Sequence, residues 1–471
     1  MNVKVRLREF VFVIIYLIFF VCLIIWSILN WDKNEIINYE KEIFPWLIVS
    51  IVLNLIGFCK IKKTSYTSIT LWFVFCSYFF MFGHVYTHVF NLKTTLLWNP
   101  SVFFSEKEKL NGAIYTLIAL TSISLGYFCF KNTNQKVKKN TYGKEPIEKK
   151  VSILGWTCFL LGFICNLLNS LIVIGKTYSA GSYLAYASAS ANVGLLDDFS
   201  YLMYPGVMYI LSGRSLSKHK KNIFIGFVIG YFILTMVFSG SRKNQIFALI
   251  AISVCYCGTK SENRISNRAV IFIFIVGVLL LNLIYVIREH RTELNTVISQ
   301  YISSLADMEF LKELVGETLT ESGLTFYSVV SIVKYVPNIF PFEYGMTFLR
   351  TLLSALPIGW LIGDFLNKGA STVVINKYTG IPVGASIIGD LYWNFGCVGG
   401  VIFSFILGAI FSKIDMILFE KDEKEPMYYS IFFVLLIGLR SGFFEIFRPL
   451  IMVTVVPYIV SLFLKLKIRK R

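Results

Sequence analysis

The sequence predicts an all-α protein with about twelve transmembrane helices and one long loop on the outer side of the membrane. Of its 471 residues, 56% are hydrophobic and only 15% are charged, whereas soluble proteins have about 25% charged residues. Apolar runs of roughly 20 residues recur along the chain, and a helix of that length spans a bilayer. Basic residues collect in alternate loops, which is typical of multi-span membrane proteins.

The first apolar run predicts a retained membrane anchor. It follows Lys4, Arg6 and Arg8, and no small-residue cleavage site comes after it, so a removed signal peptide is not indicated. Eleven further runs of similar character follow along the chain. The twelve predicted spans are 10–29, 43–59, 69–90, 112–130, 152–174, 197–213, 222–239, 242–258, 269–287, 385–411, 427–439 and 449–464.

The distribution of charge predicts the orientation of these spans. With the N-terminus inside, the inner segments hold 28 of the 45 Lys and Arg residues but only 9 of the 28 acidic residues. Lys and Arg excess marks cytoplasmic loops, so both termini are expected in the cytoplasm. The inner segments then carry a net charge of +19 and the outer segments −2, which together give the +17 of the chain. The inner positive charge faces anionic membrane lipid, and no nucleic-acid partner is needed to explain it.

The longest predicted connection is a segment at 288–384 on the outer side, within a chain that we expect to form a single integral membrane domain, 1–471. Loops of this length are usually functional or folded. An apolar stripe at helical spacing predicts an amphipathic helix in it. The stretches 323–340 and 345–363 are apolar enough to dip into the membrane as a pair. The stripe consists of Ile298, Tyr301, Leu305, Met308, Leu311 and Val315.

Arginines are predicted to gather at the outer ends of helices. One lies in the turn "VFSGSRKNQIF", where the orientation rule disfavours a basic residue. A guanidinium binds phosphate oxygens in two-pronged geometry, so the group suggests a site for the diphosphate of a lipid-linked intermediate. Contact with lipid headgroups is the alternative for Arg350, and pairing with Glu445 is the alternative for Arg448. The group is Arg242, Arg288, Arg291, Arg350, Arg440 and Arg448.

The stretch "GASIIGDLYWNFGCVGG" supplies candidates for sugar chemistry near the outer mouth of a Gly-rich helix. Asp390 is placed to take a proton from a sugar hydroxyl, and Tyr392 and Trp393 to stack on a sugar ring. The alternatives are a carboxylate at the helix entry and an interfacial aromatic belt. His290, between two of the arginines, is the second candidate base, with an ordinary loop histidine as its alternative.

The loop "GKTYSAGSYLAYASASANVG" at 175–194 predicts either a glycan groove lined by Tyr178 and Tyr183 or a flexible linker. All nine cysteines lie in apolar runs and are interpreted as small buried hydrophobic residues. No nucleotide, metalloprotease or esterase motif occurs in a suitable context. We therefore expect no cofactor and no metal.

With its "SGSRKNQIF" turn and its "GASIIGDLYWNFGCVGG" stretch, the chain resembles the O-antigen polymerase family, the repeat-unit polymerases of bacterial surface polysaccharides. The resemblance implies a GT-C-like, metal-independent glycosyltransferase of the bacterial inner membrane. It would move the growing glycan from undecaprenyl pyrophosphate to a new undecaprenyl-pyrophosphate-linked repeat unit at the outer leaflet. A chain-length regulator and a flippase join the expected partners, beside membrane lipid. The expected pyrophosphate ligands are Arg242, Arg288, Arg291, Arg440 and Arg448.

Two other activities share parts of this pattern. An O-antigen ligase, which transfers glycan to a lipid A core, uses the same arginine chemistry and looks to an outer-loop histidine, here His290. A lipid-linked oligosaccharide flippase would carry charges in the middle of several spans, whereas the charges here lie at helix ends. A structural membrane scaffold is the weakest alternative.

Overall fold

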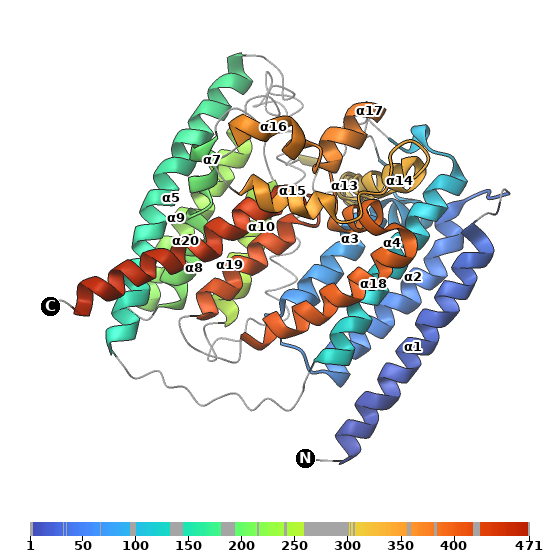
Figure 1. The fold of residues 1–471 in the computed structure, drawn as a ribbon, viewed down its shortest axis with the longest axis horizontal. Coiled ribbons are helices and arrows are strands. Elements are labelled where there is room, and N and C mark those ends of the chain that lie inside the picture. The colour runs from blue at the N-terminus through green and yellow to red at the C-terminus, as the bar shows by residue number, and fades with distance from the viewer. Residues whose placement is uncertain are drawn as a thin grey trace. The chain divides into compact units, whose positions relative to one another are not determined.

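The computed structural model describes a helical protein (Figure 1). No strand occurs among the residues that it describes. The statements below concern only these residues, which are 3–31, 33, 35–65, 67–94, 100–131, 145–179, 194–213, 216–239, 243–258, 301, 303–304, 307–355, 359–380, 384–417 and 424–469.

Eight helical segments within the described ranges are long and apolar enough to cross a membrane, so the protein is an all-helical, multi-pass membrane protein. Two shorter apolar helices, Lys243–Cys257 and Glu425–Ile437, join them. The predicted span 269–287 lies outside the described residues. The eight segments are Leu7–Trp31, Tyr39–Ile61, Ile69–Val89, Glu106–Phe130, Val151–Lys176, Lys218–Ser239, Ile387–Met416 and Phe443–Leu464.

One predicted span, 197–213, is not a single helix. It forms two short helices, α7 (Leu195–Ser200) and α8 (Met203–Ser212), with a turn between them. The cause is Pro205, because proline has no N–H to donate to the carbonyl group four residues earlier. The prediction of one continuous span here was wrong.

The chain divides into two compact units, each described here by itself. Unit 1 consists of Met1–Val137, Val315–Phe419 and Gly438–Phe447. Unit 2 consists of Lys138–Leu314, Glu420–Ile437 and Arg448–Arg471.

Unit 1 is built around α4 (Glu106–Phe130), whose residues are almost all buried. Its main partner is α18 (Ile387–Ile417), which lies beside it in Figure 1. Glycines allow the two backbones to touch, since a Cβ on Gly408 would meet the carbonyl group of Ile123. The remaining long helices of this unit are α1 (Val3–Trp31), α2 (Tyr39–Leu55), which continues into a π-helix (Ile56–Ile61), and α3 (Ile69–Val89).

A buried carboxylate joins the end of α18 to the start of α3. Asp415 accepts hydrogen bonds from the Ser68 hydroxyl, from the Ile69 N–H at 3.1 Å and from the Thr70 hydroxyl at 3.2 Å. The first N–H groups of a helix have no partner within it, so this carboxylate completes α3. The contact fixes the start of α3 against the end of α18.

Unit 2 is built around α5 (Glu145–Ser179), which contacts α7, α8 and α9 (Lys218–Ser239). Aromatic rings fill its interior, among them Tyr204 and Phe433, which stack with their centroids 4.0 Å apart. The second of these rings comes from α19 (Lys424–Ile437), and α10 (Lys243–Gly258) packs beside it. The last helix of the chain is α20 (Phe443–Arg469), whose first residues belong to unit 1.

The described part of the segment 288–384 is folded into short helices. The predicted amphipathic helix corresponds in its second half to α13 (Met308–Gly323). The helices that follow are α14 (Phe326–Tyr335), α15 (Met346–Ser354), α16 (Gly359–Asn367), a π-helix (Thr372–Asn376) and α17 (Lys377–Thr379).

Candidate functional site

Asp390, in the first turn of α18, holds the turn between α19 and α20. Its Oδ2 accepts the backbone N–H of Phe443 at 2.7 Å. The turn can come this close because residue 442 is glycine, and a Cβ there would meet the carboxylate. Asp390 is only 1% exposed, and the Ser371 side chain lies near its carboxylate. Among the described residues, Oδ1 makes no hydrogen bond of standard geometry. The carboxylate therefore positions the turn through Oδ2.

The same turn carries Arg440. Its guanidinium lies over the ring of Phe80 on α3, with 5.5 Å from Cζ to the ring centroid. A cation over an aromatic face within about 6 Å is held by the ring quadrupole. The structure thus brings two predicted site residues, Asp390 and Arg440, to one place in unit 1.

The second arginine of this region, Arg350 on α15, is ion-paired. Its Nη1 donates to Glu343 at 2.6 Å and to the carbonyl oxygen of Lys368 at 3.3 Å. Its side chain is 11% exposed and that of Glu343 is 17% exposed, so the two form a partly buried ion pair. Beyond it, the π-helix begins beside Asp390, and Thr372 donates to Glu445 at 3.2 Å. Single π turns are frequent at functional sites.

Asn394 connects α18 to the start of α15. Its Oδ1 accepts the Gly345 N–H at 3.0 Å and the Thr347 hydroxyl at 2.9 Å, while its Nδ2 donates to the carbonyl oxygen of Asp390 at 2.7 Å. All three bonds are internal to unit 1. They fix the first turns of α18, and with them the direction of the Asp390 carboxylate.

The predicted sugar-stacking residues of α18 are buried in this unit. Tyr392 packs edge-on against Tyr115 with a centroid distance of 4.8 Å and is 6% exposed. Trp393 is 1% exposed, and its Nε1 has no hydrogen-bond partner. In this structure both rings pack inside the unit, and their contact with a glycan stays a prediction.

Unit 2 contains a separate polar group with Arg448. Its Nη1 lies 3.8 Å from Asp198 on α7. The neighbouring Asp197 accepts from the Nδ2 of Asn169 on α5 at 2.9 Å, and the Oδ1 of that amide is buried without a partner. Carboxylates and amides with unused acceptors suit sugar hydroxyl groups, which are hydrogen-bond donors.

Comparison with protein families identifies the chain. The model of the O-antigen polysaccharide polymerase Wzy family matches residues 10–471. The chain belongs to this family. Comparisons with curated proteins and with solved structures give no match.

Membership in the Wzy family makes the protein a membrane glycosyltransferase-like polymerase that acts on lipid-linked repeat units. The resemblance predicted from the arginine turn and the α18 stretch is confirmed. Several predicted site residues lie outside the described residues, and their roles stay predictions. These residues are Arg242, Arg288, His290, Arg291 and Tyr183, together with the side chain of Tyr178.

The structure also brings forward a residue of this Wzy-family protein that the sequence reasoning missed, His84 on α3. The side chain is 9% exposed, and its Nε2 has no hydrogen-bond partner within the part of the chain that the structure describes. A single histidine in an apolar run carries no local pattern, so only the packing around it indicates a role. His84 follows Phe80 by four residues, and Arg440 lies over the ring of Phe80. The sequence could not show this proximity, because Arg440 is 360 residues further along the chain than Phe80.

Proposed function

We propose that the protein extends a surface polysaccharide by transferring the growing glycan from undecaprenyl pyrophosphate to a new lipid-linked repeat unit at the outer leaflet of the inner membrane. The proposal also includes a GT-C-like arrangement of twelve membrane spans with both termini in the cytoplasm. A chain-length regulator and a flippase are proposed partners. The family assignment over residues 10–471 supports the polymerising activity.

The proposed reaction is a metal-independent displacement at the sugar carbon next to the diphosphate. A hydroxyl oxygen of the new repeat unit forms a bond to that carbon while the bond from the carbon to the diphosphate oxygen breaks. The diphosphate leaves with the electron pair, and the hydroxyl proton passes to a base. Fixed guanidinium donors stabilise the charge that grows on the leaving group, which is the task of a metal ion in other transferases.

The observation that carries the proposal is the fixed position of the turn with Arg440. Asp390 accepts the Phe443 N–H of this turn, and Phe80 lies under the guanidinium. A donor that is already oriented costs no reorganisation when charge develops. We assign Arg440 to the diphosphate, and we propose Arg242, Arg288, Arg291 and Arg448 as further ligands from their predicted position at the outer ends of helices.

Replacement of Arg440 tests this assignment. With the purified protein in vesicles and an undecaprenyl-pyrophosphate-linked repeat unit, Arg440→Ala is expected to lower the polymerisation rate about 10²–10³-fold, because one charged donor to the leaving group is lost. Arg440→Lys should recover only part of this loss, since Lys cannot bind in two-pronged geometry. Glycan ladders on a gel give the measurement.

Lys312→Ala is the matched control, because it removes one exposed basic residue of α13 that pairs only with the exposed Glu309 in the described contacts. It should leave the ladder unchanged. A normal ladder from Arg440→Ala would remove that residue from the site. Wild-type protein that requires a lipid A core as acceptor would be a ligase, and protein that only moves the labelled lipid across the vesicle would be a flippase.

A further inference from the structure

A buried polar cluster in unit 1 contains a ring nitrogen, the Nε2 of His84 on α3, that has no hydrogen-bond partner among the described residues. The hydroxyl of Tyr39, at the start of α2, belongs to the same cluster and interacts with the hydroxyl of Tyr327. Tyr39 is 0% exposed and His84 is 9% exposed. Buried polar side chains are almost always hydrogen-bonded, so the unused nitrogen beside a tyrosine hydroxyl indicates a place for a polar ligand.

Both residues surround Tyr327 on α14. The rings of His84 and Tyr327 meet edge-on with a centroid distance of 4.8 Å, and the Tyr39 hydroxyl interacts with the Tyr327 hydroxyl. Tyr39 also stacks on Phe326, with 6.0 Å between centroids. The unused nitrogen of His84 and the Tyr39 hydroxyl therefore belong to one site between α2, α3 and α14.

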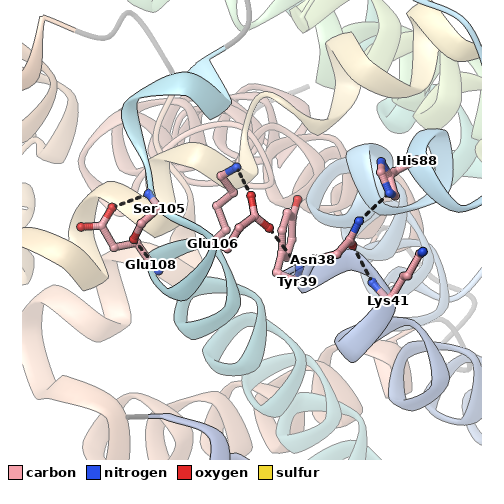
Figure 2. Close-up of polar contacts among 8 residues, drawn as sticks. Asn38, Tyr39, Lys41, His88, Ser105, Glu106 and Glu108 are labelled. Carbon is pink, nitrogen blue, oxygen red and sulfur yellow. Dashed lines mark hydrogen bonds and ion pairs between the residues drawn. The ribbon is translucent and has the colours of Figure 1, made fainter. Parts of the chain in front are cut away.

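An ion pair at the start of α4 fixes one side of this site. Glu106 accepts from Lys109 at 2.7 Å and from the backbone N–H of Tyr39 at 3.0 Å (Figure 2). The Lys109 ammonium is 5.8 Å from the centroid of the Tyr39 ring. Among the described residues, the two ammonium groups near the cluster are already paired, Lys109 with Glu106 and Lys334 with Glu108. The cluster therefore suits a neutral hydroxyl group better than a phosphate.

The cluster lies next to the proposed diphosphate site on the same helix. The Arg440 guanidinium lies over the ring of Phe80, and Phe80 precedes His84 by four residues on α3. Four residues rise roughly 6 Å along a helix, and α3 bends between them at Phe82. A sugar hydroxyl at His84 is thus within one sugar length of a diphosphate at Arg440.

We propose that His84 and Tyr39 bind the attacking hydroxyl of the acceptor sugar and that His84 Nε2 receives its proton. The inference rests on the proposed polymerase activity. In the tautomer with its hydrogen on Nδ1, the imidazole presents the Nε2 lone pair to the hydroxyl. As the oxygen bonds to the sugar carbon, the proton moves to Nε2, the carbon–diphosphate bond breaks, and the diphosphate leaves with the electron pair.

This role explains a glycine at the site. A Cβ on Gly323 of α13 would lie 2.7 Å from Cδ2 of His84 and 2.9 Å from its backbone nitrogen. The imidazole can occupy its place only because residue 323 has no side chain. Gly323→Ala is therefore expected to shift the ring and to lower the polymerisation rate with the histidine still present.

The test is a set of variants in the vesicle assay with an undecaprenyl-pyrophosphate-linked repeat unit. His84→Gln keeps a hydrogen-bonding side chain of similar length but cannot take up the proton, and it should lower kcat about 10²–10⁴-fold with little change in KM. In His84→Ala, added imidazole should restore part of the rate. Tyr39→Phe keeps the ring contacts and should raise KM for the acceptor roughly three- to tenfold.

His88→Ala is the matched control, since His88 is an exposed histidine on the same helix whose ring contacts Asn38 at 2.7 Å (Figure 2). It should polymerise at the wild-type rate. A folded His84→Gln protein with wild-type kcat overturns the inference, as does a slow His84→Ala protein that imidazole does not help. Wild-type protein without polymerisation would instead contradict the proposed function.

Discussion

At the scale of single residues, Asp390 and His84 have different roles in the proposed site: Asp390 positions the Arg440 turn, and His84 accepts the proton. Asp390 gives one carboxylate oxygen to the Phe443 N–H and is pressed against Gly442. Its sequence position predicted a base, and the alternative reading was a carboxylate at a helix entry. The geometry favours positioning of the Arg440 turn, because a carboxylate engaged in this way has only its buried Oδ1 left for substrate.

Two substitutions of Asp390 separate positioning from proton transfer. Asp390→Asn keeps an oxygen for the Phe443 N–H, and we expect it to retain most of the polymerisation rate. Asp390→Ala leaves that N–H buried without an acceptor, which costs about 1–3 kcal/mol of stability and should also lower the rate by releasing the turn. Ladder formation and thermal unfolding in detergent measure both effects. An inactive but fully stable Asp390→Asn protein would restore Asp390 as the base.

The sequence predicted two of these three site residues, Asp390 and Arg440, but not His84. Arg440 stood out because a charge near the bilayer requires compensation, and Asp390 because it lies near the outer mouth of a Gly-rich helix. The structure places them together. His84 could not be predicted, since its importance comes from Tyr327 and Gly323, which are more than 200 residues away in the chain. Long-range packing of this kind leaves no pattern in the local sequence.

At the scale of elements, α18 is interrupted at Gly396, about one and a half turns after Asp390. Gly396 has φ +66 and ψ −168, a conformation that only glycine adopts readily. Beside the interruption, the carbonyl groups of Trp393 and Asn394 accept the N–H groups of Glu343 and Tyr344 at 3.1 Å and 3.0 Å. The loop before α15 is thereby attached to α18.

Gly396→Ala tests the interruption. The substitution forces an L residue into a strained conformation, which costs about 1–3 kcal/mol, and its Cβ would lie 3.2 Å from the ring of Phe342. We expect a lower midpoint of thermal unfolding in detergent and a weaker glycan ladder. Gly230→Ala on α9 is the control, because no atom lies within 4 Å of its added Cβ. Equal midpoints for the two variants would contradict this interpretation.

Most elements could be predicted from apolar runs, but apolar runs alone do not show where helices begin, end or break. The run at 112–130 marked α4, whereas the helix begins at Glu106 with a polar first turn. Ser105 and Glu108 form a capping box there (Figure 2), and its sequence pattern is readable. The break between α7 and α8 followed from Pro205, and the break in α18 followed from the docked loop, which is a tertiary contact.

At the scale of the whole molecule, the sequence predicts the positions of the helices better than it predicts which residues form the functional site. In lipid, every backbone polar group of a span must be satisfied within its helix, so hydropathy alone indicates where helices form. The choice of helix partners depends instead on small residues. In unit 1 the backbones of α4 and α18 touch at Gly126 and Gly408, and no hydropathy profile shows which helix meets which glycine.

The predicted orientation gives the last test, since the proposed chemistry requires the start of α4 and the turn at Arg440 to face outward. The basic residues favour this arrangement, with 28 of 45 on the predicted inner side. Alkaline phosphatase fused after Asn91, between α3 and α4, should be active, and the same enzyme fused after Lys63, between α2 and α3, should be inactive. A fluorescent protein that folds only in the cytoplasm should fluoresce at the C-terminus. The reverse pattern would place His84, Arg440 and Asp390 toward the cytoplasm, where a polymer destined for the cell surface is not assembled from outer-leaflet units, and the proposed mechanism would fail.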